Sequence, residues 1–299
     1  MPDAIRTPTI RQRPADPRLE IAPLPSGGRI ARRALLAIVG VVALVLIAMA
    51  VMPGLLAPYD PNAISLTDTL KAPSATHWMG TDQLGRDMLS RVIWGSQVSL
   101  FVAFCAVLLA GVGGGLFGIA AGYLGGFVDA VAMRLADIQL ALPAVILALV
   151  LVGAIGFSMF NLIVVLSLAN WARFARVTRS EALTLRQRDF VLLAKLSGAS
   201  TPRIVLTHIV PNVVNTFIVL ATLDVGIIII LEATLSFLGL GVQPPTASWA
   251  TMIADGRGYL ETAWWICAMP GFVLMLAVLS ANLLGDALRD WLSPTLARA

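Results

Sequence analysis

The amino-acid sequence predicts an all-α polytopic membrane protein with six transmembrane helices and both termini in the cytoplasm. Hydrophobic residues make up 58% of the 299 residues, charged residues only 13%, and the mean hydropathy is +0.85. Apolar runs long enough to cross a bilayer as helices recur along the chain. The strands of a membrane barrel would instead alternate apolar and polar residues, so helical spans are favoured.

The chain begins with a polar segment, residues 1–33, that carries six prolines and seven arginines. This composition cannot bury a core, so we expect a flexible cytoplasmic tail. The apolar run over residues 34–56 is predicted to be the first span, and its length favours an uncleaved signal-anchor over a cleaved signal peptide. The arginines before it place the N-terminus inside.

Residues 57–94 are then predicted to lie on the outer side, with a turn-rich start followed by an amphipathic helix. Residues 95–288 are predicted to form the transmembrane core. Its first span, at about 98–121, is rich in glycine and includes a G-x-G-x-x-G match that no strand precedes. Small residues four apart let helices approach closely, so helix packing explains these glycines better than dinucleotide binding does.

Four more spans and a C-terminal tail complete the predicted core. The break between the third and fourth spans is placed at Gly153 and Gly156, because the apolar stretch there is too long for one helix. The predicted segments are an inner turn at 125–137, spans at about 136–154, 159–176, 213–231 and 263–284, and an inner tail at 289–299.

The basic residues support this topology. Of the 21 Lys and Arg residues, 17 fall in segments predicted to lie inside and 4 in segments predicted to lie outside. Seven lie within residues 173–203, a polar stretch that overlaps the cytoplasmic loop predicted over residues 177–206. From Asp189 to Ala199 this loop repeats apolar residues at helical intervals and then reaches Gly198, a helix stop. An amphipathic helix on the inner membrane face fits this pattern, and so does a plain basic loop that only sets topology.

The chain lacks the motifs of the common catalytic sites. It has no G-x-x-x-x-G-K-[ST] phosphate loop, no H-E-x-x-H and no G-x-S-x-G, so no catalytic or metal-binding residues are assigned. Two carboxylates stand out, because Asp224 lies within a span and Glu232 lies near its outer end. An ionisable group at bilayer depth costs on the order of 3 kcal/mol. Asp224 either lines a pathway or bonds to another helix.

Several blocks carry a family resemblance. Residues 80–91 read GTDQLGRDMLSR, residues 232–241 read EATLSFLGLG, and residues 282–290 read NLLGDALRD. With the basic loop, they resemble the permease subunits of ABC importers in the dipeptide/oligopeptide/nickel branch. In the loop, Gly198 and Pro211 match the family's coupling motif, and Ala194 holds the last position of its Glu-Ala-Ala triplet. Three residues depart from that motif: Leu192 and Leu193 replace the Glu and the first Ala, and His208 stands in place of Ile.

The resemblance implies a signal-anchor helix followed by a five-helix type I importer core in the bacterial inner membrane. It implies four protein partners: a second homologous permease, two cytoplasmic ATPases and an extracytoplasmic substrate-binding protein. ATP and Mg²⁺ would bind to the ATPases, so this chain itself would be non-catalytic and would bind no cofactor. The chain would lie in the lipid bilayer, and nucleic acid is not an expected partner.

The resemblance also implies roles for particular residues. A coupling helix would dock its apolar face into a groove of an ATPase, and the residues assigned to this coupling are Arg188, Asp189, Phe190, Val191, Ala194, Lys195, Leu196, Gly198, Ala199 and Pro211. On the outer side, a contact with the binding protein or the partner permease is assigned to Asp82, Arg86, Asp87 and Arg91. An intramolecular salt bridge and turn is the alternative for this outer block.

The function expected from this resemblance is that of a permease subunit in an ATP-driven importer of di- or oligopeptides or related small solutes. The rival interpretation is an ion-coupled secondary transporter in which Asp224 and Glu232 act along the translocation path. A membrane-embedded scaffold or enzyme is a third possibility, without a catalytic constellation to support it. Dipeptides, oligopeptides, glutathione, opines and chelated nickel all stay open as substrates.

Overall fold

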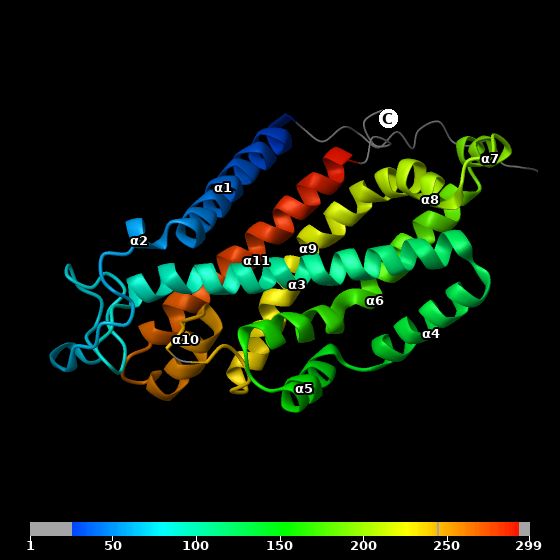
Figure 1. Cartoon of the computed structure of the whole chain (residues 1–299). Helices are drawn as coiled ribbons and strands as arrows, with labels where there is room; N and C mark the ends of the chain where they lie inside the picture. The colour runs from blue at the N-terminus through cyan, green and yellow to red at the C-terminus, as the bar shows by residue number, and fades with distance from the viewer. Residues whose placement is uncertain (1–25, 244, 293–299) are drawn as a thin grey trace, which may run out of the picture. The chain divides into compact units, whose positions relative to one another are not determined.

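The computed structural model describes residues 26–243 and 245–292, so most of the predicted N-terminal tail and the end of the C-terminal tail lie outside the described residues. The chain divides after Leu35 into two compact units, and the second holds the rest of α1 and every later helix. In order, the helices are α1 (Ser26–Val51), α2 (Pro53–Leu56), η1 (Leu66–Asp68), α3 (Met88–Leu124), α4 (Gly126–Ala141), α5 (Ala144–Ile155), α6 (Met159–Arg186), α7 (Asp189–Leu196), α8 (Thr201–Ile204), the π-helical η2 (Val205–Ile209), α9 (Val210–Phe237), α10 (Trp249–Gly256), η3 (Arg257–Tyr259) and α11 (Trp265–Leu292) (Figure 1).

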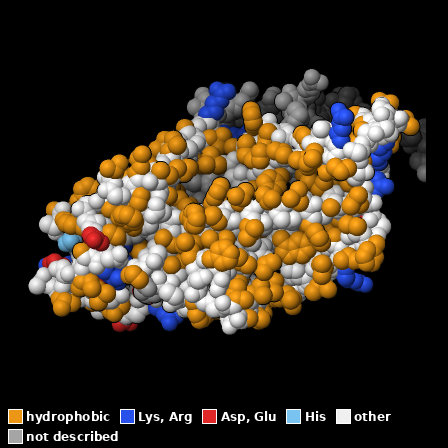
Figure 2. All heavy atoms as spheres, in the orientation of Figure 1, with side chains coloured by type: hydrophobic (Ala, Val, Ile, Leu, Met, Phe, Trp, Pro, Cys, Tyr) orange, Lys and Arg blue, Asp and Glu red, His pale blue; other side chains and the backbone are white. Residues whose placement is uncertain are grey.

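The predicted all-α membrane class is confirmed. Five helical runs are long and apolar enough to cross a membrane: one within α1, then α3, α6, the run from α8 through α9, and α11. The α4–α5 pair brings the number to six if it counts as one bent span. In Figure 2, hydrophobic side chains spread over the visible face, whereas Lys and Arg side chains gather towards its margins. A surface of this kind suits the hydrocarbon core of a bilayer.

Helices α3 and α6 form the most extensive helix pair, and glycines bring them close together. A Cβ atom at Gly114 would collide with the carbonyl oxygen of Trp171 on α6. One at Gly118 would collide with the carbonyl oxygen of Ala175 and the hydroxyl of Thr178. The predicted role of these glycines in helix packing is therefore confirmed, because only a residue without a side chain allows this approach.

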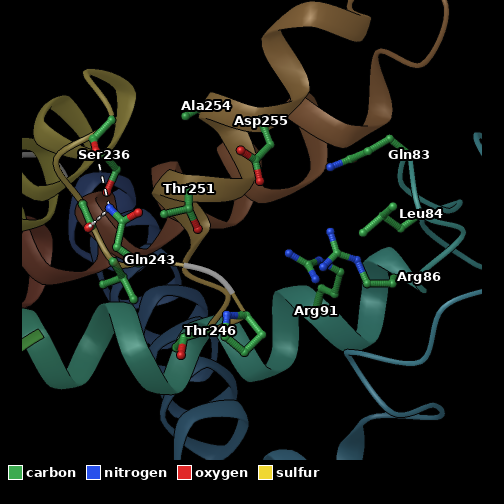
Figure 3. A pocket seen from close by; sticks show the side chains of 14 residues that line it. Gln83, Leu84, Arg86, Arg91, Ser236, Gln243, Thr246, Thr251, Ala254 and Asp255 are labelled. Carbon is green, nitrogen blue, oxygen red and sulfur yellow. Dashed lines mark hydrogen bonds between the residues drawn. The ribbon is translucent and has the colours of Figure 1, made fainter. Parts of the chain in front are cut away.

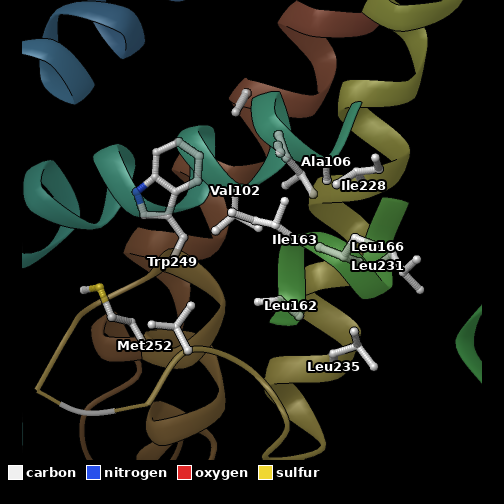
Figure 4. Packing of buried hydrophobic residues seen from close by; sticks show 14 of the residues in the cluster. Val102, Ala106, Leu162, Ile163, Leu166, Ile228, Leu231, Leu235, Trp249 and Met252 are labelled. Atoms are coloured by element: carbon white, nitrogen blue, oxygen red, sulfur yellow. The ribbon is translucent and has the colours of Figure 1, made fainter. Parts of the chain in front are cut away.

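The apolar core contains buried residues of α1, α3, α5, α6, α9, α10 and α11. Figure 4 shows side chains of α3, α6, α9 and α10 meeting in one cluster. Trp249 of α10 is fully buried in it. Its indole N–H donates to the carbonyl oxygen of Val92 at 2.9 Å, and its backbone N–H donates to the Ser99 hydroxyl at 3.1 Å. These bonds fix α10 to the beginning of α3.

The inner turn predicted over residues 125–137 is wrong. Gly125 and Gly126 alone reverse the chain, with φ of +71° and +56°, and α4 begins at once. Asp129, in the first turn of α4, forms an ion pair with Arg179 of α6. A carboxylate near a helix N-terminus is stabilising, and this one also ties α4 to α6.

A single straight helix for the third span, 136–154, is also wrong. Helices α4 and α5 meet at an angle of 96°. Pro143 lies at the bend, and Leu142 before it is extended, with φ −96° and ψ 135°. A proline disfavours helical backbone in the residue before it and lacks the N–H that would continue the ladder, so the helix ends there.

The predicted break after the third span is confirmed. Gly156 ends α5 with φ +86°, and the Ser158 side chain caps α6 by accepting from the backbone N–H of Asn161 at 3.0 Å. The predicted fourth span, 159–176, starts where α6 starts. However, α6 continues to Arg186, so the first part of the predicted loop is helical.

Candidate functional site

The basic loop contains the short helix that the sequence predicts. Helix α7 follows Arg188, which lies extended at the N-cap, and carries Asp189 in its first turn. Gly198 follows the helix with φ +78°, a conformation that suits glycine and few other residues. The backbone N–H of Gly198 donates to the carbonyl oxygen of Lys195 at 3.0 Å, which closes the last turn.

One side of α7 packs against its own chain. Val191 is fully buried, and the partly buried Ala194 and Ala199 lie beside it, against a cluster of apolar residues: Ile119, Tyr123, Ala182, Ile204, Ile209 and Val213. The Lys195 ammonium lies 5.1 Å from the centre of the Tyr123 ring. Of the residues assigned to coupling, Val191, Ala194 and Ala199 therefore point inward, and the coupling role of the helix stays a prediction.

The other side of α7 is exposed and apolar. Leu193 is 62% exposed and Leu196 is 84% exposed. Phe190 is partly exposed and stacks on His208, with ring centroids 6.1 Å apart, so the histidine that departs from the family motif supports an aromatic side chain of α7. Pro211 lies in the first turn of α9 and is exposed.

In the outer block, Asp82 is bonded within its own segment. It is 2% exposed, and its Oδ1 accepts from the backbone N–H groups of Leu84 at 2.8 Å and Arg86 at 3.0 Å. Its Oδ2 accepts from Arg86 Nε at 2.7 Å and lies 3.5 Å from Arg91 Nε. The carboxylate therefore organises a turn and holds two guanidinium groups side by side.

Asp87 is also bonded within the chain. It caps α3 by accepting from the backbone N–H of Ser90 at 2.8 Å and from its hydroxyl at 2.7 Å. Its other oxygen lies 2.9 Å from His77 Nδ1. The intramolecular alternative is thus confirmed for both acids of the outer block, and a contact with another protein stays a prediction.

A polar cavity of about 330 Å³ opens beside this block. Figure 3 shows its wall, formed by the outer block, the loop after α9 and α10. The polar lining includes Gln83, Arg86, Arg91, Gln243, Thr251 and Asp255. Partial desolvation raises the pKa of the Asp255 carboxyl, and the neighbouring Arg91 and Arg86 act in the opposite direction. Across the described residues, no group of three His, Cys, Asp or Glu residues could hold a metal ion.

The sequence pattern did not identify the cavity residues Gln83, Thr251 and Asp255. Gln83 lies inside a recognisable block, but nothing in its spacing distinguishes it from a turn residue. Thr251 and Asp255 belong to the outer loop between the last two spans, and a polar residue there is ordinary. Their common cavity depends on the packing of Trp249 against α3, which links segments about 160 residues apart in the chain.

Asp224 is paired inside the helix bundle. It is fully buried on α9, and its Oδ1 lies 2.6 Å from Arg173 Nη1 on α6. Its Oδ2 has no hydrogen-bond partner among the described residues. The interpretation as an inter-helix partner is confirmed, and a pathway role stays a prediction. The sequence contains a signal for this pair, because Arg173 and Asp224 have opposite charges and both lie in or beside an apolar span.

Glu232 has separate partners. It is 3% exposed, and its Oε1 accepts from the Ser236 hydroxyl at 2.9 Å and from the Ser248 hydroxyl at 3.3 Å. Ser248 is the N-cap of α10, so Glu232 connects α9 to the start of α10. The structure does not bring Glu232 and Asp224 into one site.

The known proteins that are similar to this chain are membrane components of transport systems. A family described as "Binding-protein-dependent transport system inner membrane component" matches residues 114–298. The chain is 42% identical over 254 residues to a probable D,D-dipeptide transport system permease of Escherichia coli K12, covering 85% of each chain. It is 45% identical over 239 residues to a nickel transport system permease of the same organism, covering 80% of this chain and 86% of the relative.

Two further comparisons extend this result. A dipeptide transport system permease of Alkalihalophilus pseudofirmus is 38% identical over 282 residues, covering 94% of this chain and 93% of the relative. The crystal structure of an amino acid ABC transporter with histidines has a TM-score of 0.52 and 14% identity, covering 68% of this chain and 94% of that chain. That structure shares the fold of this chain.

Proposed function

The chain belongs to the family of binding-protein-dependent transport system inner membrane components, and from that membership we propose that it forms half of the membrane path of an ATP-driven importer. A second homologous permease supplies the other half. Two cytoplasmic ATPases, which bind ATP and Mg²⁺, drive the transport, and an extracytoplasmic binding protein delivers the substrate. The substrates are di- or oligopeptides or related small solutes, as the names of the relatives suggest.

The arrangement of α7 is the observation that carries this proposal. One side of the helix is anchored by Val191 in an apolar cluster, and the other side exposes Leu193 and Leu196. An amphipathic helix can bind a partner by laying apolar side chains into a groove. We therefore infer that the exposed side of α7, with Phe190 at its edge, docks into a groove of the ATPase.

We place the chain in a bacterial inner membrane with α7 and both termini on the cytoplasmic side. The outer segment 57–94 and α10 then lie outside, next to the binding protein. The excess of basic residues in the basic loop and the N-terminal tail supports this orientation. In this layout Ala31–Val51 forms the first span, which ends before the predicted limit of residue 56 because Pro53 begins a separate short helix, and residues 95–288 form the permease core.

Replacing Leu196 with alanine is expected to reduce ATP-driven uptake in proteoliposomes about tenfold, in line with a central apolar contact in an interface. Because Leu196 is 84% exposed, its truncation removes no packing within the chain, and the melting temperature should not change. The buried neighbour Val191 is the matched control: Val191→Ala should destabilise the chain by about 2 kcal/mol. Unchanged uptake by Leu196→Ala would contradict the docking role.

Affinity purification of the chain in mild detergent, with mass spectrometry of the proteins that come with it, tests the assembly. A second permease and ATPase subunits are the expected companions. Uptake by the reconstituted complex should require ATP and persist when ionophores dissipate the ion gradients. Uptake that collapses with an ion gradient and needs no ATPase would replace this proposal with the ion-coupled transporter.

A further inference from the structure

The polar cavity beside the outer block places positive and negative groups on opposing walls. Figure 3 shows Arg86 and Arg91 together on one side, Asp255 of α10 facing them, and Gln83 beside the gap. No ion pair or hydrogen bond joins the carboxylate of Asp255 to another described residue. The charged groups therefore approach the same space without neutralising each other directly.

The two guanidinium groups retain capacity for a further anion. Within the described chain, Asp82 is the only carboxylate within ion-pair distance of either arginine, at 2.7 Å from Arg86 Nε and 3.5 Å from Arg91 Nε. Arg91 also donates through Nη1 to the carbonyl oxygen of Pro61 at 3.4 Å. Each guanidinium has five N–H donors, so a second carboxylate can be bound by the remaining ones.

The opposite side of the cavity offers an acceptor. Asp255 presents an exposed carboxylate. An ammonium group has three donors and a positive charge, so it complements this carboxylate.

We propose that this cavity binds a small zwitterionic solute, with its carboxylate at Arg86 and Arg91 and its ammonium at Asp255. The proposal rests on the importer function above and names a substrate class for its outer side. A dipeptide is a zwitterion of this kind, with a free ammonium at one end and a free carboxylate at the other. The volume of about 330 Å³ lies at the lower end of small-molecule sites and suits a dipeptide better than a long peptide.

Dialanine is the probe that tests this proposal. The chain would be reconstituted in nanodiscs with its partner permease and ATPases but without binding protein, and dialanine affinity would be measured by calorimetry or NMR. N-acetyl-dialanine, which lacks the ammonium, and dialanine amide, which lacks the carboxylate, should each bind about tenfold more weakly, because each loses a charge-assisted contact.

Asp255→Asn should weaken dialanine binding by about the same tenfold factor. It should leave the affinity for N-acetyl-dialanine unchanged, because that ligand has no ammonium to lose. The exposed side chain of Asp255 lies at the cavity wall, so the variant should fold normally. Glu261→Gln is the matched control, since this exposed carboxylate of the same outer region does not line the cavity, and its dialanine affinity should equal that of the wild type.

Equal dialanine affinity in Asp255→Asn and the wild type would overturn the proposal, as would failure of the wild type to bind dialanine. ATP-driven uptake, measured with binding protein added, separates this outcome from failure of the importer function. Normal peptide uptake without cavity binding removes only the zwitterion site, whereas no ATP-driven uptake removes the importer. If Asp255→Asn raises only the concentration of binding protein needed for half-maximal uptake, a basic segment of that protein occupies the cavity instead.

Discussion

Replacing Arg173 with alanine is expected to destabilise the protein by about 2–3 kcal/mol, because it leaves the buried carboxylate of Asp224 without its partner, although the Arg173 side chain is itself 44% exposed. Asp224 is fully buried, and Arg173 is its only hydrogen-bond partner among the described residues. Without the guanidinium, the carboxylate must take up a proton or draw in water at membrane depth. The melting temperature in detergent should fall, and less protein should survive purification.

Arg176→Ala is the matched control on the same helix. Arg176 pairs with Asp137, but their side chains are 50% and 52% exposed, so the loss should be at most about 1 kcal/mol. Equal destabilisation by the two variants would contradict a special role for the buried pair.

A double variant, Arg173→Met with Asp224→Leu, separates structure from transport. Apolar residues of similar volume can replace a buried ion pair without loss of stability, so this variant should melt close to the wild type. If its uptake also equals that of the wild type, the pair only joins α6 to α9. If the variant is stable but does not transport, the charges act in the translocation path.

The second large effect is expected at Gly118. Gly118→Ala should destabilise the chain by about 3 kcal/mol, because the new methyl group meets the backbone of α6 and forces the two helices apart. The atoms in the way are the Ala175 carbonyl oxygen and the Thr178 hydroxyl. The backbone carbonyl cannot rotate away, so the cost falls on the whole helix pair.

Gly113→Ala is the control for this substitution, since it adds the same methyl group to the same helix. A Cβ atom at Gly113 would have no neighbour within 4 Å in the described chain. Its melting temperature should stay the same or rise slightly, because alanine favours a helix by up to about 1 kcal/mol over glycine. A similar loss of stability in both variants would show that the contact with α6 does not decide the outcome.

Local chemistry made several elements predictable from the sequence. The α7 helix and its end at Gly198 follow from apolar spacing and from a residue that accepts positive φ. The break at Gly156 also follows from a glycine that accepts positive φ. The bend at Pro143 carried an equally clear local signal, but the apolar character of the surrounding residues suggested an uninterrupted span. Hydropathy measures whether a segment suits lipid, and does not by itself say whether its helix is straight.

Features that depend on distant segments could not be predicted. Val191 and Leu196 occupy the same amphipathic pattern, yet one is buried and the other is exposed, because α3, α6 and the segment from α8 to the start of α9 cover only one side of α7. Asp82 and Asp87 likewise looked available for a partner, but they bond within their own segment. The cavity around Asp255 exists only once α10 is fixed to α3.

The glycine contact between α3 and α6 can also act as a pivot. Helix α6 has 28 residues without a break, so from Ala175, which faces Gly118, it extends about 24 Å to Met159 and about 17 Å to Arg186 at roughly 1.5 Å per residue. At Gly118 the backbones of the two helices meet without side chains between them. If α6 behaves as a stiff rod that tilts about this contact, a tilt of about 5° displaces the Met159 end by about 2 Å and the Arg186 end by about 1.5 Å in opposite directions. A push at α7 would then become an opposed shift at Met159.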